Sequence, residues 1–279
     1  MPAPVAEDVR WRDENIDAQL KLRIYDGRRA DAAIVPLILH LHGGTFVGGS
    51  LESGAAVAGV LAATGAVVAS LDYPLAPAHP FPHAVEAAHR ALVWLARQKR
   101  RLAGPKTALF VAGEDAGGNI AAAVAMVARD RGGPALAGQI LLSPMLDPCV
   151  GTESQRKAKA GPVGCPCADG WRAYLSNADD ALHPYAAPAQ SARQAGLPPA
   201  LLLTAADDPL RDETRAHAER LLKAGVKARL HVVPAPTGWP RAYREPLSAM
   251  SESCAAALRN AVKTFLASPS ETQPSRSSS

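Results

Sequence analysis

Residues 113–117, with the sequence GEDAG, have a spacing that could present a nucleophile. The pattern G-x-S-x-G is typical of a sharp turn between a strand and a helix that exposes a serine hydroxyl for attack. The central residue here is Asp115, so the turn offers a carboxylate instead of a hydroxyl. A carboxylate needs no base to be nucleophilic, and the start of a helix favours its charged form. Gly113 and Gly117 are expected to meet the backbone requirements of the turn.

A second glycine-rich segment, residues 42–45 with the sequence HGGT, follows an apolar run. Backbone N–H groups at such a corner can be aimed at the negative oxygen that develops during acyl transfer. Gly43 and Gly44 allow a tight turn close to a substrate, whereas the side chain of Thr45 restricts the backbone. The two segments together predict an acyl-transfer site with an altered nucleophile.

Short apolar runs bounded by Gly, Pro or Asp predict the strands that must position these segments. The predicted strands cover residues 20–25, 35–41, 66–72, 107–112, 139–143, 200–205 and 228–233. The predicted helices cover residues 81–100, 118–131, 211–224 and 246–267. This alternation predicts an α/β fold with a doubly wound, mostly parallel sheet. Reactive groups are then expected at the carboxyl ends of the strands.

Residues 144–197 interrupt the alternation and are rich in Pro, Gly and Ala. One short helix is expected around residues 171–175, and the length of the segment favours a small lid over the strand ends. We therefore expect one domain over residues 1–267, with the lid inside it. Residues 268–279 are rich in Ser and Pro and are expected to be a disordered tail.

Composition argues against several classes of function. The formal charge of the 279-residue chain is +4, but no basic face interleaved with aromatic residues indicates nucleic-acid binding. The uncharged residues 53–71 are rich in small side chains, so a helix and a buried strand are expected there instead of a membrane span. The N-terminus lacks the basic start and apolar stretch of a secretion signal, and a cytoplasmic location is expected.

The four cysteines are Cys149, Cys165, Cys167 and Cys254. The spacing of Cys165 and Cys167 is too tight for the usual C-x-x-C redox or zinc pair. Free thiols in a reducing compartment are expected, and a disulfide from Cys149 to one of that pair stays open. Residues 114, 115, 207 and 208 are acidic but lack histidine ligands and a recognisable metal spacing, so no metal is expected.

Four motifs occur in the order and spacing of one family. They are HGGT at residues 42–45, DYPLAPAHPFP at 72–82, GEDAGG at 113–118 and DPLRDE at 208–213. Together they closely resemble the hormone-sensitive-lipase-like bacterial carboxylesterases, α/β-hydrolase fold-3, over roughly residues 20–266. The resemblance implies an α/β-hydrolase fold, hydrolysis of a small carboxylic ester, a small ester or acid as ligand, and no cofactor. The N-terminal cap helices usual in the family look absent or very short, and a homodimer is left open.

The resemblance also implies roles for individual residues. Asp208 stands where the family has the acid of its catalytic triad. The N–H groups of Gly44, Thr45 and Ala116 would form the oxyanion hole, next to the motif residue His42.

The sequence departs from the family pattern at the positions that carry out the reaction. Asp115 replaces the serine nucleophile, and Thr45 replaces the third oxyanion glycine. Thr237 stands at the position of the histidine, because the family sequence HGF becomes TGW at residues 237–239. The triad is therefore altered at two of its three positions, Asp115 and Thr237, and serine attack requires both a hydroxyl and a base.

Three hypotheses for function follow. The first is a degenerate hydrolase with weak or no ester hydrolysis, in which Asp115 is a nucleophile or a carboxylate contact. The second is a non-catalytic protein that binds a small ligand in the former active-site pocket. The third is an Asp-nucleophile hydrolase of halides or epoxides, which would stall after one turnover without a histidine.

Asp115 also has simpler interpretations, as a residue that drifted after catalysis was lost or as the N-terminal cap of the following helix. His183, in the expected lid, is the one histidine considered as a substitute base. The alternative interpretation of His183 is a solvated loop residue.

Overall fold

The computed structural model describes residues 9–29, 34–158, 165–234, 237 and 252–270. The strands in this part of the chain are β1 (Arg10–Asn15), β2 (Lys21–Asp26), β3 (Val35–Leu41), β4 (Val67–Asp72), β5 (Thr107–Glu114), β6 (Gly138–Leu142), β7 (Ala200–Ala205) and β8 (Ala228–Val233). The α-helices are α1 (Ala55–Ala62), α2 (His83–Ala103), α3 (Ala116–Asp130), α4 (Glu153–Lys157), α5 (Pro166–Tyr174), α6 (Arg211–Lys223) and α7 (Glu252–Ala267). Two 3-10 turns, η1 (Asp179–Leu182) and η2 (Pro188–Gln190), lie between α5 and β7.

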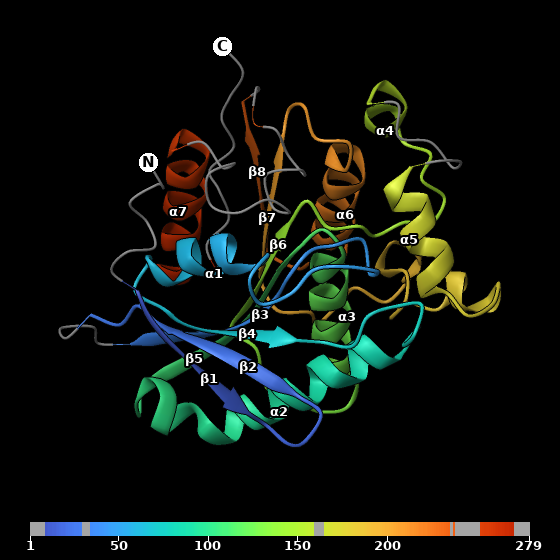
Figure 1. Cartoon of the computed structure of the whole chain (residues 1–279). Helices are drawn as coiled ribbons and strands as arrows, with labels where there is room; N and C mark the ends of the chain where they lie inside the picture. Colours follow the sequence, from blue (N-terminus) through green and yellow to red (C-terminus); the bar gives the residue numbers. More distant parts are fainter. Residues whose placement is uncertain (1–8, 30–33, 159–164, 235–236, 238–251, 271–279) are drawn as a thin grey trace, which may run out of the picture.

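The strands form one sheet in the order β1-β2-β4-β3-β5-β6-β7-β8 (Figure 1). β1 and β2, and β2 and β4, pair antiparallel. Every other neighbouring pair, from β4 through β3 to β8, is parallel. The expected doubly wound, mostly parallel sheet of an α/β-hydrolase is confirmed.

The expectation that the first strand begins near residue 20 is wrong, because β1 precedes it as the outermost strand. Its sequence, RWRDEN, is polar at every position except Trp11, and its side chains are mostly exposed. A buried strand produces an apolar run, whereas an edge strand does not need one. The guanidinium of Arg23 lies over the Trp11 ring, 4.2 Å from its centre. Arg23 therefore covers part of this exposed aromatic side chain.

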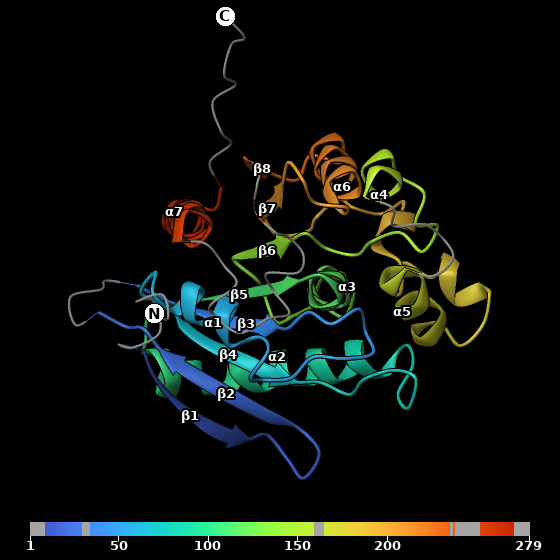
Figure 2. The same ribbon diagram turned by 45° about the horizontal axis from the view of Figure 1, so that its top comes forward.

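Helices cover both faces of the sheet, as Figure 2 shows. Side chains along a strand point alternately to the two faces, so β5 serves both. Leu109 and Val111 join the core built with α2, α3 and α6, whereas Phe110 and Ala112 join the core built with α1 and α7. Phe110 meets Phe265 of α7 edge-on, with ring centres 6.3 Å apart. This two-sided burial holds β5, and therefore the turn that follows it, in a fixed position.

The segment between β6 and β7 carries α4, α5 and both 3-10 turns, beside α6 and α3 (Figure 2). Its base is attached to the start of α6. Glu213 Oε2 accepts the N–H groups of Leu146 and Asp147 at 3.1 and 3.0 Å, and Asp212 Oδ2 accepts that of Ser154 at 2.7 Å. These contacts tie the segment to the helix that follows Asp208.

Helix α5 is longer than the short helix expected at residues 171–175. It begins at Pro166, whose fixed φ suits the first turn, and Cys165 Sγ accepts the N–H of Ala168 as a cap. Cys149 and Cys165 carry free thiols, so the disulfide left open for Cys149 does not form.

Three expected segments fall partly outside the described residues. These are residues 159–164 of the expected lid, residues 246–251 of the expected last helix and residues 271–279 of the expected tail. Among the described helices, none combines the length and the apolar character needed to cross a membrane.

His217, in α6, is expected to make the protein sensitive to acid. It is 1% exposed, and neither ring nitrogen has a hydrogen-bond partner among the described residues. Burial, with a smaller contribution from Arg220, lowers the pKa of His217 from 6.5 to about 3. Between these values the unfolded chain binds a proton that the folded chain does not, so stability falls by about 1.4 kcal/mol per pH unit as the pH drops.

We therefore expect His217→Leu to stabilise the protein more at pH 4.5 than at pH 7, as measured by urea unfolding. Leu221→Ala, at a buried position of the same helix without a titratable group, is the control and should lower stability equally at both pH values. An equal pH dependence in His217→Leu and the unmodified protein would contradict this assignment.

Candidate active site

The turn between β5 and α3 holds Asp115 in a strained conformation, with φ 55° and ψ −120°. Two glycines make this turn possible by close backbone packing. A Cβ atom at Gly117 would lie 2.0 Å from the carbonyl oxygen of Leu41, and one at Gly113 would lie 2.3 Å from that of Gly117. The expected roles of both glycines as backbone requirements follow from these distances.

Gly117→Ala is expected to destabilise the fold by about 2 kcal/mol or more, because β3 and α3 must separate to admit one methyl group. Gly59→Ala is the matched control, since Gly59 lies within α1 and a Cβ atom there meets nothing within 4 Å. Alanine at Gly59 should stabilise its helix by about 0.5–1 kcal/mol. Thermal unfolding of both variants measures the difference, and equal effects at the two sites would contradict the close packing at the turn.

The carboxylate of Asp115 occupies the expected oxyanion hole. Its Oδ2 accepts the N–H groups of Gly44 and Thr45, each at 3.0 Å. Asp115 is the N-cap residue of α3 by position, but its side chain makes no capping hydrogen bond to the helix. Ala116, the third expected donor, is buried as the first residue of α3. The two donors that would polarise a substrate carbonyl therefore bind a carboxylate of the chain itself.

The corner that carries these donors is strained and crowded. Thr45 and Phe46 have φ values of 50° and 66°, in the left-handed region that non-glycine residues rarely adopt. Helix α5 packs directly on the corner, because a Cβ atom at Gly170 would lie 2.1 Å from the carbonyl oxygen of Thr45. The rings of Phe46 and Tyr174 stack with centres 3.9 Å apart. The corner is thus held between the turn and α5.

A buried chain of polar groups links three strands to this corner. Ser70 Oγ and His40 Nδ1 are 2.9 Å apart, and His40 Nε2 lies 2.8 Å from Glu114 Oε2. The other oxygen of Glu114 accepts the N–H of Gly43 at 2.9 Å. All three side chains are 0% exposed. Glu114 thereby fixes the residue next to the two donors, a role that the sequence motifs did not assign to it.

The motif residue His42 supports the corner from its other side. Its ring stacks on Tyr73 with centres 4.3 Å apart, and Tyr73 Oη donates to the carbonyl oxygen of His42 at 2.7 Å. Burial lowers the pKa of His42 from its usual value, so the ring is neutral at pH 7. Its Nδ1 lies 2.9 Å from the carbonyl oxygen of Gly43.

Asp208, the residue at the family's acid position, is engaged by hydroxyl groups. Ser143 Oγ and Thr204 Oγ1 both donate to its Oδ2, the latter at 2.6 Å, and the N–H of Leu210 donates to Oδ1 at 2.8 Å. Burial raises the pKa of Asp208, and the nearby charge of Asp115 adds to the increase. The three hydrogen bonds act in the opposite direction and lower this pKa, but burial has the larger effect. Sequence reasoning missed Ser143 and Thr204, although both lie at the carboxyl ends of strands, where reactive groups were expected.

Among the described residues, no hydrogen bond joins Thr237 to Asp208. Its N–H and Oγ1 donate to the two carboxylate oxygens of Asp207, at 2.8 and 2.6 Å. Gly238 and Trp239, the rest of the TGW sequence, lie outside the described residues. The structure thus places Thr237 beside Asp207, the residue that precedes the expected acid Asp208.

All eight histidines lie within the described part of the chain. Among the hydrogen bonds described there for Asp115 and Asp208, none involves a histidine. His183, the candidate substitute base, is exposed, accepts the N–H of Tyr185, and has its ring centre 5.0 Å from that of Phe81. This environment matches the alternative interpretation of His183 as a solvated loop residue.

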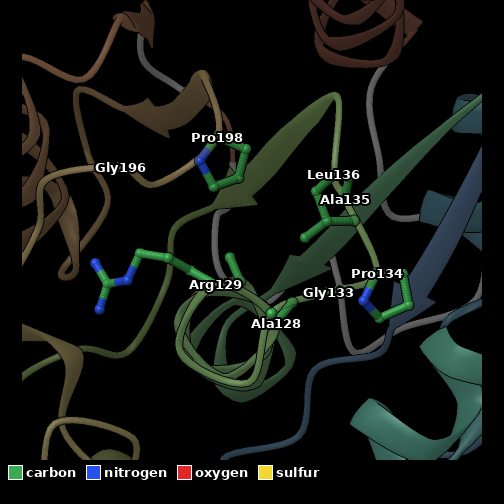
Figure 3. A pocket seen from close by; sticks show the side chains of 10 residues that line it. Ala128, Arg129, Gly133, Pro134, Ala135, Leu136, Gly196 and Pro198 are labelled. Carbon is green, nitrogen blue, oxygen red and sulfur yellow. The ribbon is translucent and has the colours of Figure 1, made fainter.

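Two pockets lie away from the turn. One of about 300 Å³ lies at the far end of α3, among Arg129, Gly133 and Pro198 (Figure 3). Because the 15-residue α3 is about 22 Å long, this pocket is remote from Asp115. Another, of about 840 Å³, lies beside α2 and includes Tyr73, the side chain that supports His42. In the part of the chain that is described, no cluster of three or more His, Cys, Asp or Glu side chains is arranged to hold a metal ion.

Comparisons with known proteins agree with the fold and the motifs. The model of the family described as alpha/beta hydrolase fold matches residues 38–237. Esterase LipI of Mycobacterium tuberculosis is 35% identical over 238 residues, which are 82% of this chain and 74% of that protein. Gibberellin receptor GID1A of Arabidopsis thaliana is 34% identical over 222 residues, 75% of this chain and 64% of the receptor. The solved structure of a thermostable esterase from Pseudomonas putida has a TM-score of 0.81 at 30% identity, covering 94% of this chain and 84% of that one.

Proposed function

We propose that this chain, which belongs to the alpha/beta hydrolase fold family and is carboxylesterase-like, hydrolyses carboxylic esters very slowly or not at all. One observation carries the proposal. The carboxylate of Asp115 accepts both N–H groups that would otherwise stabilise the oxyanion of an ester substrate. Occupied donors cannot lower the barrier to acyl transfer, and a carboxylate placed there repels a developing negative charge.

The surroundings of Asp208 support the same proposal. In the triad of a serine hydrolase, the acid orients a histidine, and the histidine takes the proton of the nucleophile. Here Ser143, Thr204 and Leu210 donate to the carboxylate of Asp208. Because Thr237 binds Asp207 instead, we infer that the triad is degenerate at the nucleophile Asp115 and at Thr237.

A ligand-binding protein without catalysis is the second candidate. Two observations favour it: one relative is named a gibberellin receptor, and a pocket of about 840 Å³ adjoins the oxyanion corner through Tyr73. A pocket of that size suits a small organic ligand. The third candidate, an Asp-nucleophile hydrolase, would require a histidine to complete its second step.

Other features of the protein remain proposals. We propose that residues 144–197 act as a lid, which the packing of Tyr174 on Phe46 supports. A cytoplasmic location agrees with the free thiols of Cys149 and Cys165. A small ester or acid as ligand and a homodimer are kept as expectations.

Steady-state hydrolysis of p-nitrophenyl esters with acyl chains of increasing length tests the proposed function. We expect rates close to those of buffer for every ester. Calorimetric titration with the corresponding acids and non-hydrolysable amides separates the first two candidates, because saturable binding without turnover supports the ligand-binding protein. Rapid turnover that Asp208→Asn abolishes would overturn the proposal of a degenerate triad.

A further inference from the structure

We propose that His79 and His83 together bind one divalent transition-metal ion of the Ni²⁺, Cu²⁺ or Zn²⁺ type in the groove beside α2. Both imidazoles line this groove of about 840 Å³, as do Asp72 and Glu86. The site requires neither ester hydrolysis nor the binding of a small organic ligand, so it is independent of the proposed function.

The two imidazoles lie at the distance that a shared metal ion needs. Their ring centres are 5.6 Å apart. Two imidazole nitrogens that each bind one ion at about 2.0–2.1 Å place their ring centres about 5–6 Å apart in a tetrahedral site. His83 is the first residue of α2, and His79 precedes it in the turn that leads into the helix. Both side chains are exposed, so rotation about their side-chain bonds can turn the nitrogens toward one ion.

A backbone carbonyl prepares the ring of His83 as a metal ligand. His83 Nδ1 lies 2.8 Å from the carbonyl oxygen of Pro80, and a carbonyl can only accept a hydrogen bond. Nδ1 therefore carries the hydrogen, which leaves the lone pair of the neutral ring on Nε2. Histidines that bind a metal usually donate their other ring N–H in this way. Among the described residues, no hydrogen bond to the ring of His79 competes with a metal ion.

The charges that line the groove favour a cation. Arg90 lines it but pairs with Asp17. Glu86 lines it as well and pairs with Arg131 at 2.5 Å. Asp72 is the remaining charged side chain of the lining, and it forms no ion pair among the described residues. Its negative charge opposes the positive end of the α2 dipole, which alone would disfavour a cation at the start of the helix.

The ligand set also selects the kind of ion. Imidazole nitrogens suit Ni²⁺, Cu²⁺ and Zn²⁺, whereas Mg²⁺ and Ca²⁺ prefer oxygen ligands. In the described part of the chain, no group of three or more His, Cys, Asp or Glu side chains is arranged for a metal ion. Water would therefore fill the other coordination positions, and we expect the ion to bind reversibly.

A bound ion would also fasten the segment that supports helix α5. His79 and His83 flank Phe81, whose N–H donates to the carbonyl oxygen of Tyr174 at 2.7 Å. The ring of Phe81 meets that of Tyr174 edge-on, with centres 5.9 Å apart. Because an ion that binds the folded chain stabilises it by mass action, we expect the ion to raise the melting temperature.

Calorimetric titration of the untagged full-length protein with NiCl₂ tests the proposal. We expect one Ni²⁺ per chain. His79→Gln and His83→Gln should each weaken binding by about 100-fold or more, because a chelate then loses one of its two ligands. His231→Gln is the matched control, since His231 lies in the outermost strand β8 and lines a different pocket. It should leave the affinity unchanged, and MgCl₂ should give no heat of binding.

Circular dichroism establishes that each variant is folded, and thermal unfolding with and without Zn²⁺ provides a second measurement. A melting temperature that Zn²⁺ raises in the unmodified protein but not in His83→Gln supports the site. The exposed thiol of Cys149 is a rival ligand, so Cys149→Ser should bind Ni²⁺ as the unmodified protein does. Equal Ni²⁺ affinity in the unmodified protein and both histidine variants would falsify the site. The absence of any Ni²⁺ binding, or its loss in Cys149→Ser, would overturn it as well.

Discussion

The double substitution Asp115→Ser with Thr237→His is expected to raise p-nitrophenyl acetate hydrolysis by about 100-fold or more over Asp115→Ser alone. Serine at position 115 supplies a hydroxyl and vacates the N–H groups of Gly44 and Thr45. Without a base, however, that hydroxyl keeps its proton, so the single substitution stays nearly inactive. Histidine at position 237 adds the base from the segment that now binds Asp207.

The surroundings of Asp208 make this experiment more specific. Ser143 Oγ and Thr204 Oγ1 already donate to the oxygen that a histidine would approach. Adding Ser143→Ala to the double variant removes one of these donors and should raise the rate further. Asp115→Ser with Thr237→Asn is the control for side-chain size. Equal rates for the His and Asn variants would show that position 237 does not deliver a base to the site.

The second large effect is expected on stability. His40→Leu should destabilise the fold by about 3–5 kcal/mol, because it leaves the carboxylate of Glu114 buried without its imidazole partner. Glu114 would keep the N–H of Gly43 as a donor, which is insufficient for a buried charge. Urea unfolding at pH 7 measures the loss.

A second substitution separates this electrostatic effect from a loss of packing. In the His40→Leu background, Glu114→Gln removes the uncompensated charge and should recover part of the lost stability. In the unmodified background, Glu114→Gln should cost less than His40→Leu, since a glutamine can still bond both His40 and Gly43. If His40→Leu lowers the free energy of unfolding by less than about 1 kcal/mol, the buried pair of His40 and Glu114 contributes no more to stability than an exposed ion pair does.

Much of the sheet could be predicted because its central strands are buried on both faces. β7 and β8 match the predicted residues 200–205 and 228–233, since apolar runs between turn residues mark such strands. β1 gave no such signal because it is an exposed, polar edge strand. Helix α3 begins at Ala116, two residues before the predicted start, although Gly117 and Gly118 disfavour helix. A Cβ atom at Gly118 would lie 2.9 Å from that of Pro144, so packing between distant segments overrides the local preference.

The motifs predicted the candidate site residues but not the directions of their side chains. Family spacing located Asp115, yet its bond to residues 44 and 45 joins segments about 70 positions apart and has no local sequence signal. Ser143 and Thr204 were missed because single hydroxyls at the ends of apolar strands form no motif. The rule that reactive groups gather at the carboxyl ends of parallel strands could have identified both. Thr237 illustrates the opposite case, since its position in the motif did not reveal that it binds Asp207.

We propose that the carboxylate of Asp115 occupies the N–H groups of Gly44 and Thr45, the donors of the expected oxyanion hole. Amide hydrogen exchange and chemical shifts of Gly44 and Thr45, compared by NMR between the unmodified protein and Asp115→Ala, test it most directly. The account predicts that both amides exchange faster and shift in the variant, because each loses a charge-assisted hydrogen bond. Unchanged exchange and unchanged shifts at both amides would contradict the account.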